Sequence, residues 1–173
     1  MIIKNNNIYF FFLILVFSIS FSGLSFSEVK TKLSVRGSGE LVPRFVSLKY
    51  DEVYMRKGPS RDHPIDWVYK TKYLPLKIVS EFENWRKVID SEGTIGWIHR
   101  SQLSNKRKVQ VILENLKIRN KPNIDAKVIA IAEIGALLNL ERCDEKWCRL
   151  SYQKIKGWSS RNGFFGLIKD EIP

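Results

Sequence analysis

The chain repeats itself once, with a period near 62 residues, and this duplication limits the folds that it can adopt. Three stretches recur in the same order, at offsets of 63, 62 and 61 residues. They are 53–60 with 116–123, 85–88 with 147–150, and 96–97 with 157–158. Because a solenoid needs three or more repeats for stability, two copies indicate a small domain that is present twice.

Each copy consists of short apolar stretches separated by turn residues, which is typical of closely spaced strands. The predicted strands of the first copy are 46–49, 53–57, 67–70, 76–82, 85–89 and 94–98. Those of the second copy are 109–113, 116–119, 127–131, 137–141, 147–152 and 155–158. No stretch after residue 30 has the periodicity of a long amphipathic helix, so we expect an all-β fold. The Gly-Trp pair that ends each copy fits this, since a glycine within a strand lets another backbone approach closely.

Residues 1–27 have the composition of a secretory signal peptide. Lys4 is their only charged residue, and an apolar run is followed by several serines. Ser25 and Ser27 fit the small-residue positions of a cleavage site, which places the cut after Ser27. We therefore expect an exported protein, periplasmic or extracytoplasmic. The alternative is an uncleaved membrane anchor, because residues 8–26 nearly reach the ~20 residues of a spanning helix.

Cys143 and Cys148 are the only cysteines of the chain. Disulfides persist in exported proteins, so we predict a disulfide across two strands joined by a tight turn at 144–146. Free thiols and a metal site are the alternatives. A metal would need further ligands, and the two histidines, His63 and His99, lie far upstream in the sequence.

The repeated motifs carry a resemblance to a known family. Copy one contributes Arg56, Gly58, Pro59, Trp67, Tyr69, Trp85, Val88, Gly96, Trp97 and Leu103. Copy two contributes Arg119, Pro122, Cys143, Trp147, Cys148, Gly157 and Trp158. In this pattern the chain resembles the bacterial SH3-like domain family, and within it an exported tandem group. The resemblance covers residues 45–166 and implies two tandem SH3-like small β-barrels after an N-terminal signal peptide.

The domain organisation follows from the resemblance together with the composition. The segments are a signal peptide (1–27), a flexible N-terminal segment (28–44), SH3-like domain 1 (45–104), a basic linker (105–108), SH3-like domain 2 (109–166) and a C-terminal tail (167–173). Copy two departs from the family pattern at Lys121, where copy one has Gly58. If this turn needs a positive φ, copy two is strained or uses another turn.

The first copy has more aromatic residues than a 60-residue barrel can bury, and this surplus suggests a ligand surface. Strand alternation places Val53 and Met55 in the core and Tyr54 and Arg56 outside. The candidate binding groove consists of Tyr54, Arg56, Trp67, Tyr69 and Trp85. The alternatives are that Trp67 and Trp85 belong to the core, and that Arg56 and its repeat Arg119 bond turn carbonyls.

No catalytic constellation is visible in the sequence, so we predict no enzymatic activity, no metal and no cofactor. The carboxylates of Asp51, Glu52, Glu81, Glu83 and Asp90 are expected to form a solvated face. Better-known bacterial SH3 modules recognise cell-wall peptides. The resemblance therefore implies an envelope binding module whose partner is a cell-wall peptide or an envelope protein segment. The alternative is a structural protein that scaffolds an envelope protein complex without binding the wall.

The formal net charge of +11 does not indicate a nucleic-acid partner. The positive charge is spread over both copies, and Lys106, Arg107 and Lys108 form its one basic run. Export would also remove access to nucleic acid. The charge instead predicts weak, salt-sensitive contact with anionic envelope polymers or a membrane surface.

Overall fold

The computed structural model describes residues 32–33, 37–169 and 171–173. The predicted signal peptide, residues 1–27, lies outside these ranges. Strands make up nearly all the regular structure of the described residues, together with the short 3-10 helix η1 (Arg100–Gln102). Within them no helix is long and apolar enough to cross a membrane. The predicted all-β fold class is confirmed.

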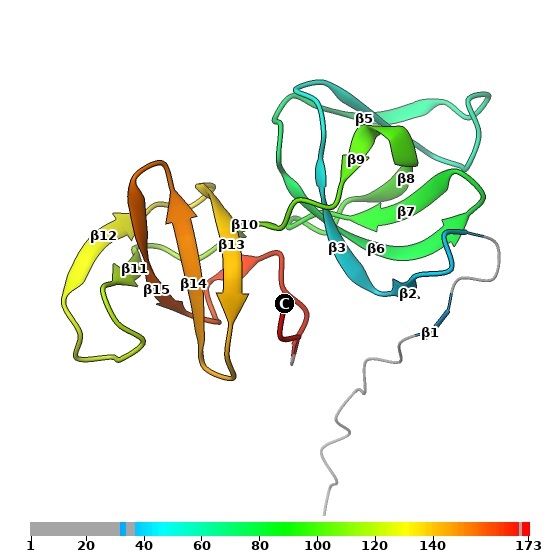
Figure 1. Ribbon diagram of the computed structural model, residues 1–173. Coiled ribbons are helices and arrows are strands. Elements are labelled where there is room, and N and C mark those ends of the chain that lie inside the picture. The colour runs from blue at the N-terminus through cyan, green and yellow to red at the C-terminus, as the bar shows by residue number, and fades with distance from the viewer. Residues whose placement is uncertain (1–31, 34–36, 170) are drawn as a thin grey trace, which may run out of the picture. The chain divides into compact units, whose positions relative to one another are not determined.

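The first barrel is an antiparallel seven-stranded sheet that curves around one core (Figure 1). Its strands are β3 (Arg44–Leu48), β4 (Val53–Arg56), β5 (Ile65–Tyr69), β6 (Pro75–Phe82), β7 (Trp85–Ile89), β8 (Ile95–His99) and β9 (Leu103–Ser104). They lie in the order β5-β4-β8-β7-β6-β3-β9, so the closing strand β9 pairs with the opening strand β3. Ahead of this barrel, β1 (Lys32–Leu33) pairs with β2 (Leu41–Val42).

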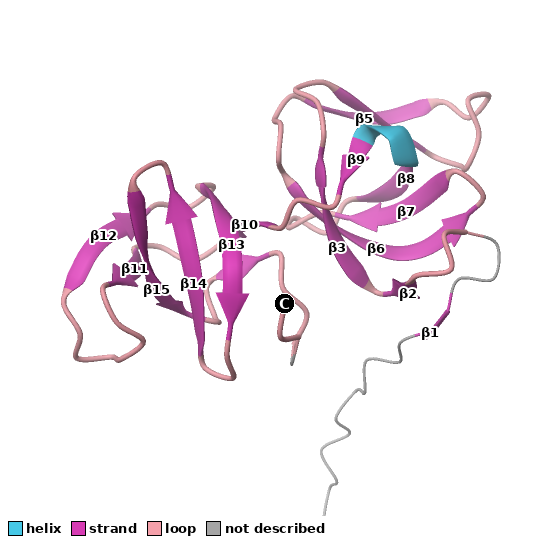
Figure 2. Ribbon diagram, in the orientation of Figure 1, coloured by secondary structure: helices cyan, strands magenta, loops and turns pink. Residues whose placement is uncertain are grey.

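The second barrel has the same architecture (Figure 2). Its strands are β10 (Lys108–Val111), β11 (Leu116–Arg119), β12 (Val128–Ala132), β13 (Leu137–Cys143), β14 (Trp147–Tyr152), β15 (Ile155–Ser160) and β16 (Phe164–Phe165). Their order is β12-β11-β15-β14-β13-β10-β16, which equals that of the first barrel when strands are counted from the start of each copy. The duplication read from the sequence is therefore a duplication of the whole fold.

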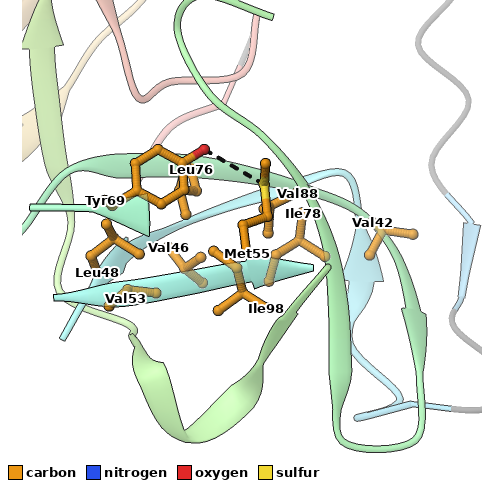
Figure 3. Packing of buried hydrophobic residues seen from close by; sticks show 10 residues of the cluster. All are labelled: Val42, Val46, Leu48, Val53, Met55, Tyr69, Leu76, Ile78, Val88 and Ile98. Carbon is orange, nitrogen blue, oxygen red and sulfur yellow. Dashed lines mark hydrogen bonds between the residues drawn. The ribbon is translucent and has the colours of Figure 1, made fainter. Parts of the chain in front are cut away.

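The core of the first barrel follows from alternation along its strands (Figure 3). Val53 and Met55 of β4 are fully buried, whereas Tyr54 between them is exposed, as the alternation predicts. The core cluster comprises Val42, Val46, Leu48, Val53, Met55, Tyr69, Leu76, Ile78, Val88 and Ile98.

The second barrel has a core of its own. Its cluster comprises Val109, Val111, Leu116, Ile118, Leu138, Leu140, Cys143, Cys148, Leu150 and Phe164. Each copy thus buries a separate set of apolar side chains, which is what a duplicated domain requires.

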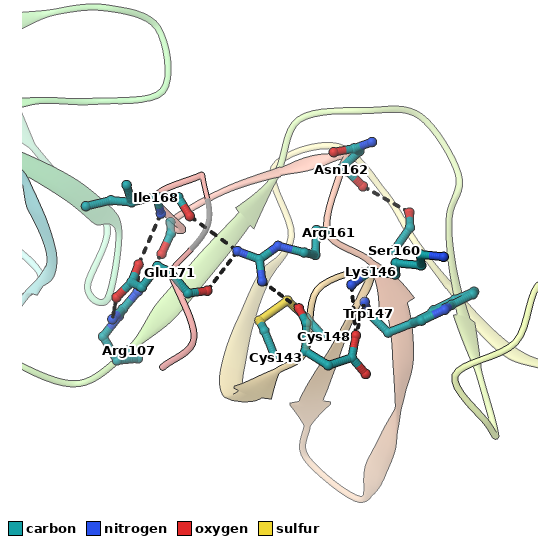
Figure 4. Close-up of a disulfide and its surroundings, with 12 residues drawn as sticks. Arg107, Cys143, Lys146, Trp147, Cys148, Ser160, Arg161, Asn162, Ile168 and Glu171 are labelled. Carbon is teal, nitrogen blue, oxygen red and sulfur yellow. Dashed lines mark hydrogen bonds and ion pairs between the residues drawn. A yellow bond between two sulfur atoms is a disulfide. The ribbon is translucent and has the colours of Figure 1, made fainter. Parts of the chain in front are cut away.

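The predicted disulfide between Cys143 and Cys148 is present and joins β13 to β14 (Figure 4). The two residues are direct register partners. The turn between them is closed by the Asp144 carboxylate, which accepts hydrogen bonds from the backbone N–H groups of Lys146 and Trp147 at 2.9 Å and 2.7 Å. These bonds hold the Asp144 pKa below its ordinary value.

The C-terminal residues are held by two arginines of the second barrel region (Figure 4). Arg107 forms an ion pair with Glu171 at 2.5 Å. Arg161 donates to the carbonyl oxygens of Glu171 at 2.8 Å and Asp144 at 2.6 Å. Arg107 belongs to the predicted linker and Glu171 to the predicted tail, so these segments contact each other.

The glycine of each Gly-Trp pair allows the close approach expected from the sequence. A Cβ on Gly96 would lie 3.0 Å from the carbonyl oxygen of Arg56 and 2.5 Å from the Met55 side chain. A Cβ on Gly157 would lie 2.6 Å from the carbonyl oxygen of Arg119. These contacts are too short for any larger residue, so glycine lets β8 and β15 cross β4 and β11.

Candidate functional site

The repeated arginine anchors the loop between the second and third strands of each barrel. The Arg56 guanidinium donates to the carbonyl oxygen of His63 at 2.7 Å, and that of Arg119 donates to the carbonyl oxygen of Ala126 at 2.6 Å. In both copies the acceptor lies seven residues after the arginine. The structural role that repetition suggested is confirmed by these bonds, and ligand contact by Arg56 stays a prediction.

The same loop explains why copy two does not need the glycine that copy one has at position 58. Gly58 does not have a positive φ, but a Cβ there would lie 2.3 Å from ring atoms of His63. In copy two, Ala126 stands at the place of His63, so no ring occupies this space and Lys121 can replace the glycine. The difference between the copies is therefore steric and involves no backbone strain.

The five predicted groove residues fall into two classes by exposure. Trp67 is 50% exposed and Tyr54 is 38% exposed, and Arg56 is half-buried. Tyr69 is only 5% exposed and Trp85 9%. Trp67 and Tyr54 are therefore accessible to a ligand. The Tyr69 ring belongs to the core cluster, whereas the Trp85 ring is buried outside that cluster, on the face of β7 and β8 that carries His99.

Strand pairing places the two exposed rings on opposite faces of the β4–β5 ribbon. Trp67 is paired with Met55, which faces the core, and its ring lies edge-on to Tyr69 with the centroids 6.5 Å apart. Tyr54 is paired with Val68, and both are exposed. Directly paired residues share a face. The structure thus brings Trp67 to Tyr69 but does not place Tyr54 on that face.

Tyr69 is fixed by a buried hydrogen bond. Its hydroxyl donates to the Asp90 carboxylate at 3.0 Å. The same hydroxyl contacts the Met55 sulfur at 3.6 Å (Figure 3). Burial and the neighbouring carboxylate raise the pKa of Tyr69 far above its ordinary value. This ring therefore stabilises the barrel as a neutral phenol.

Trp85 lies beside a polar cleft that the sequence did not reveal. Its ring packs edge-on against His99, with the ring centroids 5.3 Å apart. His99, Arg44, Arg86 and Arg100 line this cleft, whose volume is about 530 Å³. Glu40 also lines the cleft and pairs with Arg44 at 2.7 Å, and Arg86 pairs with Glu81. Arg100, which has no ion pair with a described residue, is the guanidinium that can bind an anionic group such as a carboxylate.

Glu81 holds two of these arginines in place. Its buried carboxylate pairs with Arg44 at 2.5 Å and with Arg86 Nε at 2.9 Å, and accepts a bond from the backbone N–H of Ser38 at 2.6 Å. Burial alone would raise the Glu81 pKa, but the bonds from Ser38 and Arg44 outweigh it and the pKa is lowered. Ser38 belongs to the predicted N-terminal segment, so this segment contacts the barrel.

The expected solvated face of carboxylates is wrong for two of its five members. Glu81 and Asp90 are 7% exposed, and each has a defined partner. The register explains Glu81, because it lies directly opposite Arg86 across the β6–β7 turn. Placing that turn at residues 83–84 would have predicted the pair from the sequence.

His99 is the titratable ring of the cleft. Burial and the nearby guanidinium groups of Arg61, Arg100 and Arg86 lower its pKa. Its Nδ1 lies 2.7 Å from the Ser101 hydroxyl. Within the described part of the chain, no three His, Cys, Asp or Glu side chains are grouped to hold a metal ion.

Comparison with known families assigns this fold. A family model described as the bacterial SH3 domain matches the chain twice, over residues 49–105 and 114–162. The two matches together span more than half of the chain. The chain belongs to the bacterial SH3 domain family. Each match falls on one of the two barrels, so the resemblance stated from the sequence motifs is confirmed.

Solved structures that are similar to this tandem bacterial SH3 protein are distant. NlpC2 from Trichomonas vaginalis is 12% identical, with a TM-score of 0.33, over 71% of this chain and 48% of that one. NlpC1 from Trichomonas vaginalis is 12% identical, with a TM-score of 0.33, over 79% of this chain and 49% of that one. This chain spans about half the length of each. No curated protein matches it.

Proposed function

We propose that this protein is a non-enzymatic binding module of the cell envelope, which recognises peptides of peptidoglycan or an extended protein segment. Bacterial SH3 domains are binding domains, which supports the general assignment. The observation that carries the proposal is the half-exposed Trp67 on β5. A ring of this size at the surface is a suitable anchor for a ligand.

The position of β5 supports an extended ligand. β5 lies at the end of the strand order of its sheet, beside β4. Ile65, Trp67 and Val68 of this strand are 45%, 50% and 37% exposed. An extended peptide adds to such an edge through backbone hydrogen bonds, and its side chains then contact the exposed residues.

The basic cleft beside Trp85 supports a ligand with free carboxylates. Arg86 is nearly buried and is already oriented by Glu81, so its guanidinium is held in place before a ligand arrives. Arg100 is exposed at the same cleft. Fixed guanidinium groups bind carboxylates more strongly than mobile ones.

The function as proposed takes place outside the cytoplasm, as the sequence of residues 1–27 indicates.

A sedimentation assay with purified, protein-free peptidoglycan tests the proposal. We expect the wild-type protein to be retained and Trp67→Ala to lower retention about tenfold, the loss typical of removing one aromatic anchor. Trp67→Phe should retain most of the binding. Tyr50→Ala is the matched control, because Tyr50 is 49% exposed in the same barrel but lies outside β5.

Two results would count against the proposal. Equal retention of wild type and Trp67→Ala would remove Trp67 from the site. No retention of the wild type, together with crosslinking in cells to one defined envelope protein, would favour the scaffold alternative. Trp85→Ala is unsuitable here, because loss of a buried ring tests folding. Hydrolysis of peptidoglycan by the purified protein would contradict the non-enzymatic assignment.

A further inference from the structure

The two barrels differ most at one face of the ribbon made by their second and third strands. Trp67 pairs with the third residue of β4, and Ala130 pairs with the third residue of β11. Tyr69 pairs with the first residue of β4, and Ala132 with the first of β11. Both ribbons also have their register shift after that third residue. Two large rings of the first barrel are thus two methyl groups in the second.

In the first barrel Tyr69 is part of the core cluster, and the half-exposed Trp67 lies against it. Tyr69 is buried and its hydroxyl reaches Asp90, while Trp67 covers it edge-on. At the place of Asp90 the second barrel has Tyr152, two residues after the last aligned core position. Tyr152 is 51% exposed, so it does not fill the space that Tyr69 fills in the first copy.

The second barrel is open at this position. A pocket of about 340 Å³ lies there, within the range of ~300–1,000 Å³ that is usual for ligand sites. Its lining includes Ala130 and Ala132 of β12 and the core residues Ile118, Leu138 and Leu150. The lining is mostly aliphatic, so it suits an apolar group.

The pocket lies beside a free strand edge. β12 is the last strand in the order of its sheet and, among the described strands, pairs with β11 alone (Figure 1). Ile129 and Ile131 of β12 are 42% and 57% exposed. A strand added at this edge would place alternate side chains on the face where the pocket opens.

The charge at the pocket favours a cationic neighbour for the apolar group. Glu133 follows β12 directly and lines the pocket, and it is exposed. Its carboxylate makes no hydrogen bond or ion pair with any described residue. A lysine or arginine next to the apolar side chain of a partner would pair with it.

We propose that the pocket of the second barrel binds an aromatic side chain of an extended polypeptide, which pairs with the free edge of β12 and carries a basic residue beside that ring. The partner thereby supplies the ring that the first barrel supplies itself through Tyr69 and Trp67. The site is separate from the Trp67 surface and does not depend on the peptidoglycan assignment.

Titration of the whole protein with a defined peptide tests this site. The probe is a capped heptapeptide of threonine and valine with a central tryptophan and a lysine two residues after it, because alternate side chains of a strand share a face. Methyl NMR signals of Ala130 and Ala132 report binding, and we expect saturable shifts. Replacing the tryptophan of the probe by alanine, or its lysine by glutamate, should weaken binding about tenfold each, equal to the loss of one anchor.

Variants of the protein test whether the probe binds at this pocket. Ala130→Trp restores the ring of the first copy and should weaken binding at least about tenfold. Glu133→Lys, at an exposed position, should reverse the preference between the lysine and glutamate probes, and it keeps the test valid if Ala130→Trp does not fold. Trp67→Ala is the matched control in the first barrel and should bind the probe as the wild type does.

Three outcomes of the probe titrations would overturn the proposal. They are equal binding by wild type and a folded Ala130→Trp, equal binding of the tryptophan and alanine probes, and a probe preference that Glu133→Lys leaves unchanged. Concentration-dependent self-association in sedimentation velocity that Ala130→Trp abolishes would also overturn it, because the occupant would then be a second copy of this chain.

Discussion

At the scale of single residues, the His63 ring and Gly58 form a pair that copy two has replaced as a unit. A methyl group on Gly58 would overlap the ring, and Ala126 removes that ring in copy two. We expect Gly58→Ala to destabilise the first barrel in the wild type and to be neutral or stabilising beside His63→Ala. The expected coupling is about 1 kcal/mol, measured by a double-mutant cycle in urea. Additive effects of the two changes would contradict a steric coupling. Lys121→Ala, at the equivalent position of copy two, is the control and should not destabilise the second barrel.

Residue roles were predictable where the repeat itself carried the information. Arg56 and Arg119 recur at one position, and both bond the carbonyl oxygen seven residues later. Exposure was not predictable in the same way. Trp67 and Trp85 look alike in the sequence, but Trp67 lies on the edge strand β5 and is half-exposed, whereas Trp85 lies on the central strand β7 and is buried. This difference depends on strand order.

At the scale of elements, the β13–β14 hairpin is fixed by its disulfide. Cys143 and Cys148 are both buried within the second core. We expect the double variant Cys143→Ala/Cys148→Ala to lower the free energy of unfolding by about 2 kcal/mol. The reason is that the disulfide reduces the number of conformations that the unfolded chain can adopt. Urea unfolding monitored in the second barrel measures this. Reductant should destabilise the wild type and leave the double variant unchanged, and an equal response of both would refute a stabilising role for the bond.

The longer strands were predicted well, and the shortest elements were not. Each predicted strand overlaps an observed one, since each is an apolar stretch bounded by turn residues. The short strands β1, β2, β9 and β16 and the helix η1 were not predicted, and β1 and β2 lie in the segment that was predicted to be flexible. All are two or three residues long. They are defined by pairing with a partner strand or by a local turn, so the sequence pattern carries too little signal.

At the scale of the whole molecule, the duplicated fold was predictable and the difference between the copies was not. The matched motifs lie on strands that both barrels need for their cores. The segments that carry Trp67 and Ala130 share almost no sequence, so only the paired registers show that these residues are equivalent. The open pocket of the second barrel and the basic cleft of the first therefore required the structure.

Acid should weaken both barrels, because each contains a carboxylate whose pKa is lowered on folding. The pKa values of Glu81 in the first barrel and Glu171 beside the second both lie below their ordinary value of 4.5. Burial alone would raise both pKa values, but bonds from Ser38 and Arg44 to Glu81, and from Arg107 to Glu171, outweigh it. The unfolded chain then binds more protons than the folded one as the pH falls below about 4.5.

The stabilisation from these carboxylates is therefore complete above about pH 4.5 and is lost as the pH falls through their folded pKa values. The net charge of +11 at pH 7 rises further in acid, and its self-repulsion acts in the same direction. Urea unfolding at pH 7 and pH 3 measures the effect.

At pH 7 we expect Glu81→Ala to lower the free energy of unfolding by about 3 kcal/mol, because it leaves Arg44 and Arg86 without their partner. At pH 3 the difference between this variant and the wild type should shrink, because protonation neutralises the same carboxylate. A difference that stays constant between the two pH values would show that Glu81 stabilises the barrel by packing and not by charge.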